Sequence, residues 1–151
     1  MSRKVEGLVW AKRADVPVFP PTRRSRGPKA LGLRYERQIK AALPAAEAGI
    51  WWQFQDENGP GACQTDFLLL GREFALVLEA KYTYTQDAWP QLFELYRPVV
   101  ERATGRAFLG VQICKILTPE ARNVVHSLQE ANRAVRFGGL VTLHWSGIGP
   151  L

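Results

Sequence analysis

The chain has 151 residues, of which 46% are hydrophobic, and this is enough to bury the core of one compact domain. No apolar run is long enough to cross a membrane, no signal-like segment follows the N-terminus, and the two cysteines form neither a disulfide framework nor a zinc site. These features argue against membrane, disulfide-rich and zinc-finger classes, and we expect a cytoplasmic protein with no membrane partner.

The formal net charge of +6 is concentrated at the N-terminus, because residues 1–29 carry eight Lys or Arg side chains and only two acidic ones. The same segment contains four prolines, whereas acidic and basic residues balance in the rest of the chain. We therefore predict a basic arm, residues 1–29, beside a domain formed by residues 30–151. Such an arm suits a polyanion, because binding releases counterions, although a solubilising tail explains the charge equally well.

The first elements expected in the domain are a helix and a short strand. Apolar side chains recur at helical spacing from Tyr35 to Leu43, which predicts a helix that ends near Pro44. Residues 50–54 are aromatic and β-favouring, which predicts a strand. The run Asn-Gly-Pro-Gly at residues 58–61 is a dense turn signal.

A β-hairpin is expected next. Two apolar runs, residues 66–70 and 73–81, flank a break at Gly71-Arg72. This pattern predicts two strands that are buried on both faces and joined by a two-residue loop. With that loop, Leu70 would face Glu73, and this pair would fix the register of the hairpin.

The second half of the chain predicts two further helices and two further strands. A helix over residues 87–103 is expected to kink at Pro98, and a strand follows over residues 108–117. A third helix over residues 118–138 and a last strand over residues 140–145 complete the order. The expected fold class is α/β, of the α+β type, with a mixed sheet flanked by helices.

Three charged residues interrupt the apolar hairpin. Glu79 and Lys81 are two residues apart on one strand, so both side chains leave the same face. In the predicted register Asp66 faces Val77, which makes Asp66 and Glu79 diagonal neighbours on that face, with Cβ atoms roughly 7 Å or less apart. Two carboxylates can then converge on one cation.

These residue types indicate a particular chemistry. Two carboxylates with room for water are ligands for Mg²⁺, or Mn²⁺ as its substitute, whereas a zinc site would use His or Cys. A neighbouring Lys81 can orient the attacking water, help to deprotonate it, or stabilise charge that develops on a phosphate. Phosphodiester hydrolysis needs these parts. The alternative is structural: an ion pair between Glu79 and Lys81 at a strand end, with Asp66 terminating a turn.

Asp66, twelve intervening residues and then Glu79-Ala80-Lys81 resemble the D…(D/E)XK signature of the PD-(D/E)XK nuclease superfamily. Thr65 stands where the pattern nominally has proline, a position that takes no part in metal binding. The αβββαβ core of the superfamily also resembles the order of elements expected between residues 31 and 117. The resemblance therefore implies a restriction-endonuclease-like core with an extra C-terminal helix and strand.

The same resemblance extends to further site residues. Glu36, on the flank of the first helix, matches the additional acidic residue that many members contribute to the metal site, although a solvated glutamate fits equally well. The backbone carbonyl of Ala80 is a further implied ligand. Gln91 and Tyr96 resemble a QxxxY element with one residue too many. In an α-helix they would lie about 140° apart, which predicts that Tyr96 belongs to the core and leaves Gln91 to position substrate or water.

His126 and His144 are interpreted as structural residues, because neither lies near the hairpin signature in sequence. Trp51 and Trp52 could stack on bases, but an aromatic pair that enters a sheet more often belongs to the core. The sequence thus predicts a metal-dependent deoxyribonuclease that uses Mg²⁺ and acts on DNA. Likeness to phage-type junction resolvases implies a homodimer in a bacterial or phage-infected cell. Two alternatives stay open: a non-catalytic nucleic-acid-binding protein that uses its basic arm, and an accessory protein that keeps the fold for protein contacts.

Overall fold

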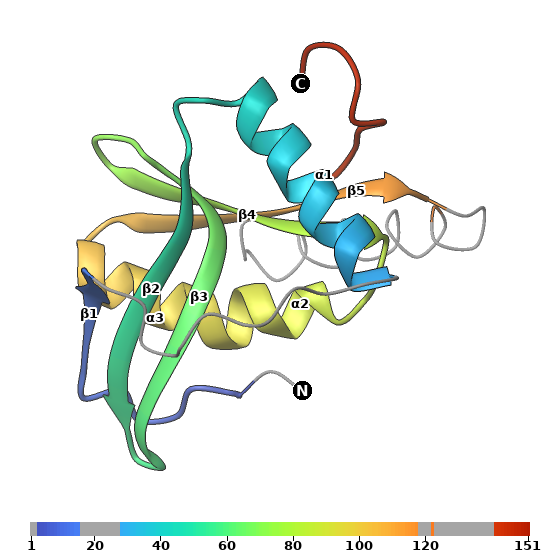
Figure 1. Ribbon diagram of the computed structural model, residues 1–151. Coiled ribbons are helices and arrows are strands. Elements are labelled where there is room, and N and C mark those ends of the chain that lie inside the picture. Colours follow the sequence, from blue (N-terminus) through green and yellow to red (C-terminus); the bar gives the residue numbers. More distant parts are fainter. Residues whose placement is uncertain (1–2, 16–27, 118–121, 123–140) are drawn as a thin grey trace.

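The protein is described by a computed structural model that covers residues 3–15, 28–117, 122 and 141–151. A mixed six-stranded sheet, in the order β1-β2-β3-β4-β5-β6, runs through the described part (Figure 1). The first four strands pair antiparallel, whereas β4–β5 and β5–β6 are parallel. The strands are β1 (Trp10–Ala14), β2 (Glu47–Asp56), β3 (Gly59–Leu70), β4 (Phe74–Thr83), β5 (Ala107–Ile116) and β6 (Val141–His144).

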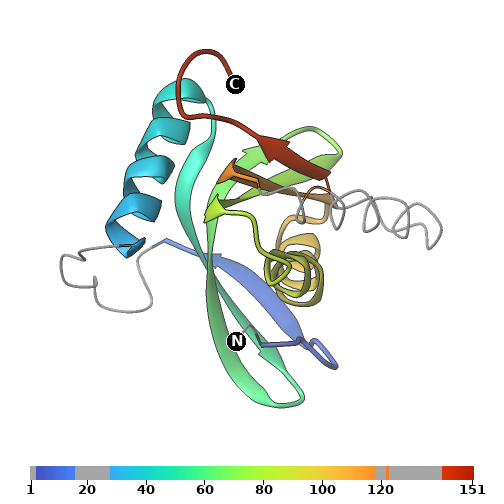
Figure 2. The same ribbon diagram turned by 90° about the vertical axis from the view of Figure 1, so that its right-hand side faces the viewer.

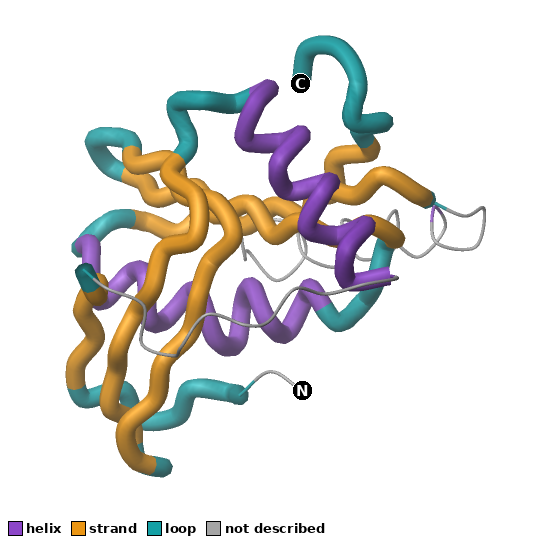
Figure 3. Tube along the Cα trace, in the orientation of Figure 1, coloured by secondary structure: helices purple, strands orange, loops and turns teal. Residues whose placement is uncertain are grey.

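Helices cover both sides of this sheet, so the predicted α+β class with a mixed sheet is confirmed. Helix α1 spans Pro28–Ala42, which agrees with an end near Pro44. Three helical segments then follow one another without a break: α2 (Ala88–Pro90), η1 (Gln91–Tyr96) and α3 (Arg97–Thr104). They form one continuous rod in Figure 3, and Figure 2 shows this rod and α1 on opposite sides of the sheet.

Each side has its own apolar core. Under α1, Tyr35 and Ile39 pack on residues of three central strands: Phe67, Leu78 and Ile113. On the other side, η1 and α3 pack against strands that curl around them, and this larger core includes Trp52, Phe54, Val77, Leu92, Val99 and Val100. The apolar residues of β3 and β4 are therefore divided between two cores, which explains why both strands are apolar almost throughout.

The hairpin between β3 and β4 has a longer turn than the sequence predicts. Leu70 pairs with Ala75, not with Glu73, and the Gly71 N–H donates to the Phe74 carbonyl over 2.8 Å. A Cβ at Gly71 would lie 2.6 Å from the Phe74 ring, so the ring packs directly over the glycine in this turn. The predicted register is wrong by two residues. Because the side-chain period of a strand is two, the faces of all side chains remain as predicted.

The N-terminal residues form an edge strand that the sequence analysis did not anticipate. β1 pairs antiparallel with β2, and Arg3 anchors the preceding segment through an ion pair with the buried Asp56 carboxylate. The Glu6 N–H donates to the same carboxylate over 3.1 Å. Residues 3–15 are therefore built into the sheet. Three further arginines of the predicted arm, Arg23, Arg24 and Arg26, lie outside the described residues.

The β2–β3 hairpin is also longer than expected. The turn falls at residues 57–58, where Asp56 pairs with Gly59, and β3 continues from there through the predicted turn residues Pro60 and Gly61. The Asp56 side chain accepts a hydrogen bond from the Asn58 N–H over 3.0 Å, which closes the turn. Asp56 thus joins the N-terminal segment to this hairpin.

A π-helical turn precedes Pro98 in the helical rod. Segment η1 is a π-helix, and the Arg97 N–H donates to Leu92, five residues earlier. Pro98 then lies in the first turn of α3, where its missing N–H costs little. It offers no N–H to the carbonyl of Glu94, four residues before it, and that carbonyl accepts a hydrogen bond from the Val5 N–H over 3.0 Å.

The C-terminal elements are described in part. The predicted last strand is confirmed as β6, where a ring nitrogen of His144 lies 2.9 Å from the Lys115 carbonyl oxygen. Apart from Arg122, the residues of the predicted helix over 118–138 lie outside the described residues, and so does His126. Among the described helices, none combines the length and apolar character needed to span a membrane.

Thr65, the residue at the nominal proline position, has a structural role that can be tested. Its buried hydroxyl accepts a hydrogen bond from Trp52 Nε1 at 3.0 Å and donates to the Ile50 carbonyl at 3.4 Å. Thr65→Val is expected to destabilise the protein by about 1–3 kcal/mol, because it leaves the indole N–H unsatisfied. Urea unfolding measures this, with Thr65→Ser as the control that keeps the hydroxyl. Equal stability of the parent and the valine variant would contradict this role.

Candidate active site

Asp66 lies at an opening in the sheet. Regular pairing of β3 with β4 stops at Phe67 and Leu78, one step before Asp66 would meet Glu79. On the other side of Asp66, pairing with β2 skips Gly49, which has a positive φ of 64°. The Asp66 carboxylate itself replaces a ladder bond, because Oδ2 accepts a hydrogen bond from the Ala80 N–H at 2.9 Å. The strands therefore part where the first predicted metal ligand lies.

Glu79 comes opposite Asp66 in this register and is 3% exposed. One of its oxygens, Oε1, lies 3.3 Å from Lys81 Nζ, so the two residues form the ion pair considered above. The other, Oε2, is buried and has no hydrogen-bond partner among the described residues. An unsatisfied buried carboxylate oxygen is costly unless something binds it. Glu79 therefore has one oxygen available to a cation and one engaged with Lys81.

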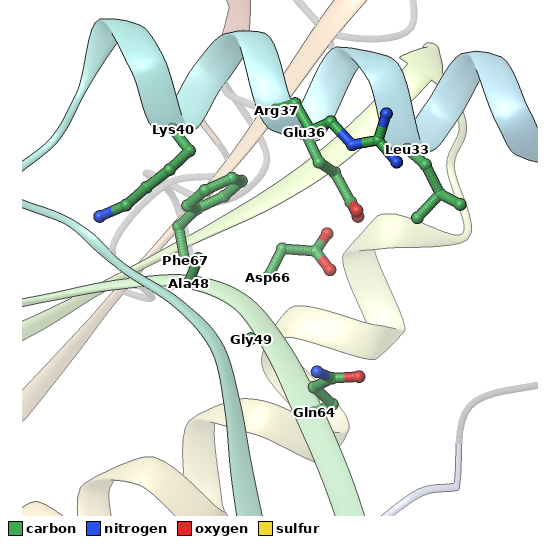
Figure 4. Close-up of a pocket in the computed structure, with 9 residues that line it drawn as sticks. All are labelled: Leu33, Glu36, Arg37, Lys40, Ala48, Gly49, Gln64, Asp66 and Phe67. Carbon is green, nitrogen blue, oxygen red and sulfur yellow. The ribbon is translucent and has the colours of Figure 1, made fainter. Parts of the chain in front are cut away.

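Glu36 approaches the same point from α1. Its carboxylate points from the helix towards Asp66 in Figure 4, and both residues line a pocket of about 500 Å³ between α1 and the β2–β3 strands. Arg37 and Lys40 line the pocket from the helix. The helix flank that the sequence assigned to Glu36 thus faces the sheet, and a fully solvated glutamate does not describe this position.

The pKa values of all three carboxyl groups are raised above their ordinary values. Burial, then repulsion from and hydrogen bonding to Asp66, raises the pKa of Glu36 to about 7. Burial also raises the pKa of Asp66, against the opposing effect of the Ala80 N–H. The pKa of Glu79 is raised well above its usual value by burial and by Asp66, with Lys81 opposing. A divalent cation would relieve the same repulsion that protons relieve here.

Gln91 and Tyr96 correct the prediction made for an α-helix. In the π-helical turn, residues five apart come onto one face, and Gln91 Nε2 donates a hydrogen bond to the Tyr96 hydroxyl at 2.6 Å. The hydroxyl in turn donates to the Gln64 carbonyl at 2.9 Å. Tyr96 is buried, as predicted. Burial raises its pKa, and so do the charges of Glu79 and Asp66, which places this pair beside the carboxylates.

Gln112 was missed by the sequence analysis. It pairs with Glu79 across β4 and β5, so the two side chains share a face, and it is fully buried. Its Oε1 accepts a hydrogen bond from the Thr85 N–H at 3.1 Å, whereas Nε2 has no partner within the described part of the chain. Gln112 therefore fixes the loop that leads from β4 to the helical rod. The sequence did carry a signal for Gln112, because its side chain is a single amide in a strand that is otherwise mostly apolar.

The donor set fits a hard divalent cation. It offers the Asp66 carboxylate, the unpartnered Glu79 oxygen and Glu36 above them, all oxygen donors of the kind that Mg²⁺ prefers. No three acidic, His or Cys side chains of the described residues already surround one position as a finished metal cage. Side-chain rotation would therefore have to accompany the binding of a cation here.

The structure brings the predicted site residues into one region: Asp66, Glu79, Lys81, Glu36, Ala80 and Gln91. His144 lies on β6 at the Lys115 carbonyl. No protein-family model matches the chain, and no curated protein matches it in sequence.

Proposed function

We propose that the protein is a Mg²⁺-dependent deoxyribonuclease of the PD-(D/E)XK type. The observation that carries this proposal is the Glu79 carboxylate, which is buried opposite Asp66 with one oxygen unpartnered and the other paired with Lys81. A carboxylate cluster of this kind costs stability when it is empty, and a purely structural ion pair does not require Asp66 and Glu36 beside it. Cation binding gives all three carboxylates a role.

Each side chain has a distinct task in this mechanism. Asp66 and Glu79, with Glu36 and the Ala80 carbonyl as further oxygen donors, would hold the ion. Mg²⁺ supplies charge that neutralises the scissile phosphate and favours attack by water. Lys81 can orient the attacking water or stabilise the negative charge that develops on the phosphate. Gln91, held by Tyr96, can position the substrate by a hydrogen bond from its amide.

The order of the elements supports the same proposal. From α1 through β2, β3, β4, the helical rod and β5, the chain follows the αβββαβ order of the restriction-endonuclease-like core. β1 and β6 extend the sheet at its two edges. Asp66 and the Glu79-Ala80-Lys81 run lie on the second and third strands of that unit. A fold order alone does not define an activity, so the proposal depends on the site.

The proposal is tested by incubating the protein with single-stranded, duplex, flap and four-way DNA in Mg²⁺, in Mn²⁺ and in EDTA. Cleavage that requires the divalent ion is the expected result. Salt-sensitive DNA binding without cleavage on any of these substrates would favour the non-catalytic alternative. Absence of both binding and cleavage would favour an accessory role in protein contacts.

Lys81→Ala is expected to separate catalysis from metal binding. A charged lysine is not a metal ligand, so Mn²⁺ affinity should stay within a few-fold of the parent, or rise as the competing ammonium is lost. Cleavage should fall by about a hundredfold or more, because charge stabilisation in the transition state disappears. Calorimetric Mn²⁺ titration and single-turnover cleavage measure the two effects. A large loss of Mn²⁺ affinity would show that Lys81 builds the ligand set instead.

The basic N-terminal segment is expected to contribute to DNA association. Because residues 3–14 include β1, the charge is removed by a triple Arg23→Ala, Arg24→Ala, Arg26→Ala exchange and not by deletion. The slope of log affinity against log salt should shrink by roughly 0.9 for each duplex phosphate that the variant no longer neutralises. Cleavage at saturating DNA should stay within about tenfold of the parent. Arg72→Ala, in the exposed β3–β4 turn, is the control, and an unchanged slope in the triple variant would refute this role in DNA binding.

A further inference from the structure

A second pocket continues the one above Asp66. It has a volume of about 450 Å³ and reaches from the shared residues Ala48, Gly49 and Gln64 to the end of β1. Its remaining lining comes from two places, the β1 end and β2: Arg13, Ala14, Asp15, Ile50 and Trp51. We call the two pockets together the β2–β3 groove. One end of this groove is the carboxylate site, and the other lies beside Arg13 and Trp51.

Gly49 opens the floor of the groove. Its φ of +64° belongs to the left-handed region, and it lies opposite Asp66, where the β2–β3 ladder is interrupted. A Cβ at this position would stand 3.0 Å from the Gln64 amide nitrogen. Figure 4 shows Gly49 and Gln64 below Asp66, and both of these residues line the two pockets. At its midpoint the groove is therefore lined by the Gly49 backbone and by the Gln64 side-chain amide beside it.

The lining combines basic and aromatic groups. Trp51 is half-buried and pairs with Gln64 across the strands. Arg37 projects from α1, and Arg13 forms an exposed ion pair with Glu47 at 2.9 Å. Lys40 instead closes the end of α1, donating to the carbonyls of Pro44 and Ala46. A groove with arginines along it and an indole in its wall has the features of proteins that bind single-stranded nucleic acid.

The charges of the lining indicate when such a ligand binds. Three basic residues, Arg13, Arg37 and Lys40, are matched by three acidic ones, Asp15, Glu36 and Asp66. The groove is thus close to neutral until a divalent cation occupies the carboxylates. A polyanion should accordingly bind more tightly when a cation is present.

We propose that the β2–β3 groove binds one unpaired DNA strand, with a base against Trp51 and the adjoining backbone directed to Asp66. Pockets of about 450 and 500 Å³ have the size of small-molecule sites, which accept a single base or nucleotide. Bases inside a duplex are stacked and paired, so they cannot enter such pockets, whereas unpaired bases can stack on an aromatic side chain. The direction towards Asp66 rests on the proposed nuclease function, whereas binding in the groove does not.

The experiment measures binding of a fluorescently labelled oligothymidylate and of a matched hairpin duplex by anisotropy, in Ca²⁺ and in EDTA. Calcium is the probe because it binds carboxylate oxygens but lacks the strict octahedral geometry of Mg²⁺. The single strand should bind at least about tenfold more tightly than the duplex, and more tightly in Ca²⁺ than in EDTA. Trp51→Ala should weaken single-strand binding by about five- to a hundredfold. Trp10→Ala on β1, outside the groove, should leave it unchanged.

A second pair of variants separates the groove from general effects on folding. Gly49→Asn keeps a residue that tolerates the left-handed backbone but puts a side chain into the groove, and it should reduce single-strand affinity by about tenfold or more. Gly105→Asn is the matched control, because Gly105 has a φ of 68° and nothing within 4 Å of an added Cβ. Circular dichroism checks that each variant is folded.

Two results would overturn the inference: equal or tighter binding of the duplex, or unchanged single-strand affinity in folded Gly49→Asn and Trp51→Ala. The groove proposal and the nuclease proposal can fail independently. If the variants lose single-strand binding while no substrate is cleaved in Mg²⁺, the groove stands and the nuclease proposal falls. If Mg²⁺-dependent cleavage is observed but the groove variants bind and cleave like the parent, the nuclease proposal stands and the groove is wrong.

Discussion

Asp66→Asn and Glu79→Gln are each expected to reduce Mg²⁺-dependent DNA cleavage by at least about a hundred- to thousandfold, because each removes a negatively charged oxygen donor from the ion. The metal-free proteins should be as stable as the parent or more stable. Each substitution relieves repulsion within a buried cluster whose carboxyl pKa values are already raised. Single-turnover cleavage, calorimetric Mn²⁺ titration and thermal unfolding in EDTA measure the three effects.

Glu73→Gln is the matched control for these variants. Glu73 precedes β4, is exposed and lies at the opposite end of the strand from Glu79, so its neutralisation should change neither cleavage nor Mn²⁺ affinity. If Asp66→Asn or Glu79→Gln cleaved DNA at the rate of the parent protein, the substituted residue would not belong to the active site. A large loss of stability in Glu79→Gln would show instead that the ion pair between Glu79 and Lys81 is structural, which is the alternative to a metal site.

The central carboxylates were predictable because they depend on local rules. Asp66 and Glu79 stand out as charges in apolar strands, and strand alternation fixes the face on which each side chain lies. The predicted loop of the β3–β4 hairpin was too short, yet an error of two residues preserves side-chain parity. The shared face thus agreed with the structure, and the pairing came out more favourable than predicted, because Asp66 comes opposite Glu79 and not diagonal to it.

The elements that were missed depend on contacts between distant parts of the chain. β1 resembles a basic tail in sequence, and it becomes a strand through pairing with β2 and through the bond between Arg3 and Asp56. The π-helical turn was missed because the 100° rotation of an α-helix was assumed throughout. Pro98 leaves the Glu94 carbonyl free for Val5, a partner that no local pattern reveals. Gly49 carried no signal either, since its role depends on lying opposite Asp66.

The affinity of the site for Mn²⁺ or Mg²⁺ is expected to fall steeply below about pH 7. Burial and repulsion from Asp66 raise the pKa of Glu36 to about 7, and the pKa values of Asp66 and Glu79 are raised as well. Each carboxyl that must lose its proton adds a slope of up to about one to log affinity against pH. Calorimetry from about pH 5.5 to 8 measures this slope. An affinity independent of pH would place the ion elsewhere.

The stability of the metal-free protein should follow the opposite course. A carboxyl with a raised pKa binds more protons in the folded than in the unfolded state. The contribution of Glu36 is therefore complete below its ordinary pKa of 4.5 and lost as the pH rises to about 7. Thermal unfolding in EDTA measures this loss of stability in the parent and in Glu36→Gln. The comparison is needed because carboxyls with lowered pKa values, such as Glu47 and Asp56, change the stability with pH in the opposite direction. Above pH 7, Mn²⁺ at a hundred times its Kd should restore about 2.7 kcal/mol to the parent, and no stabilisation there would contradict a metal site.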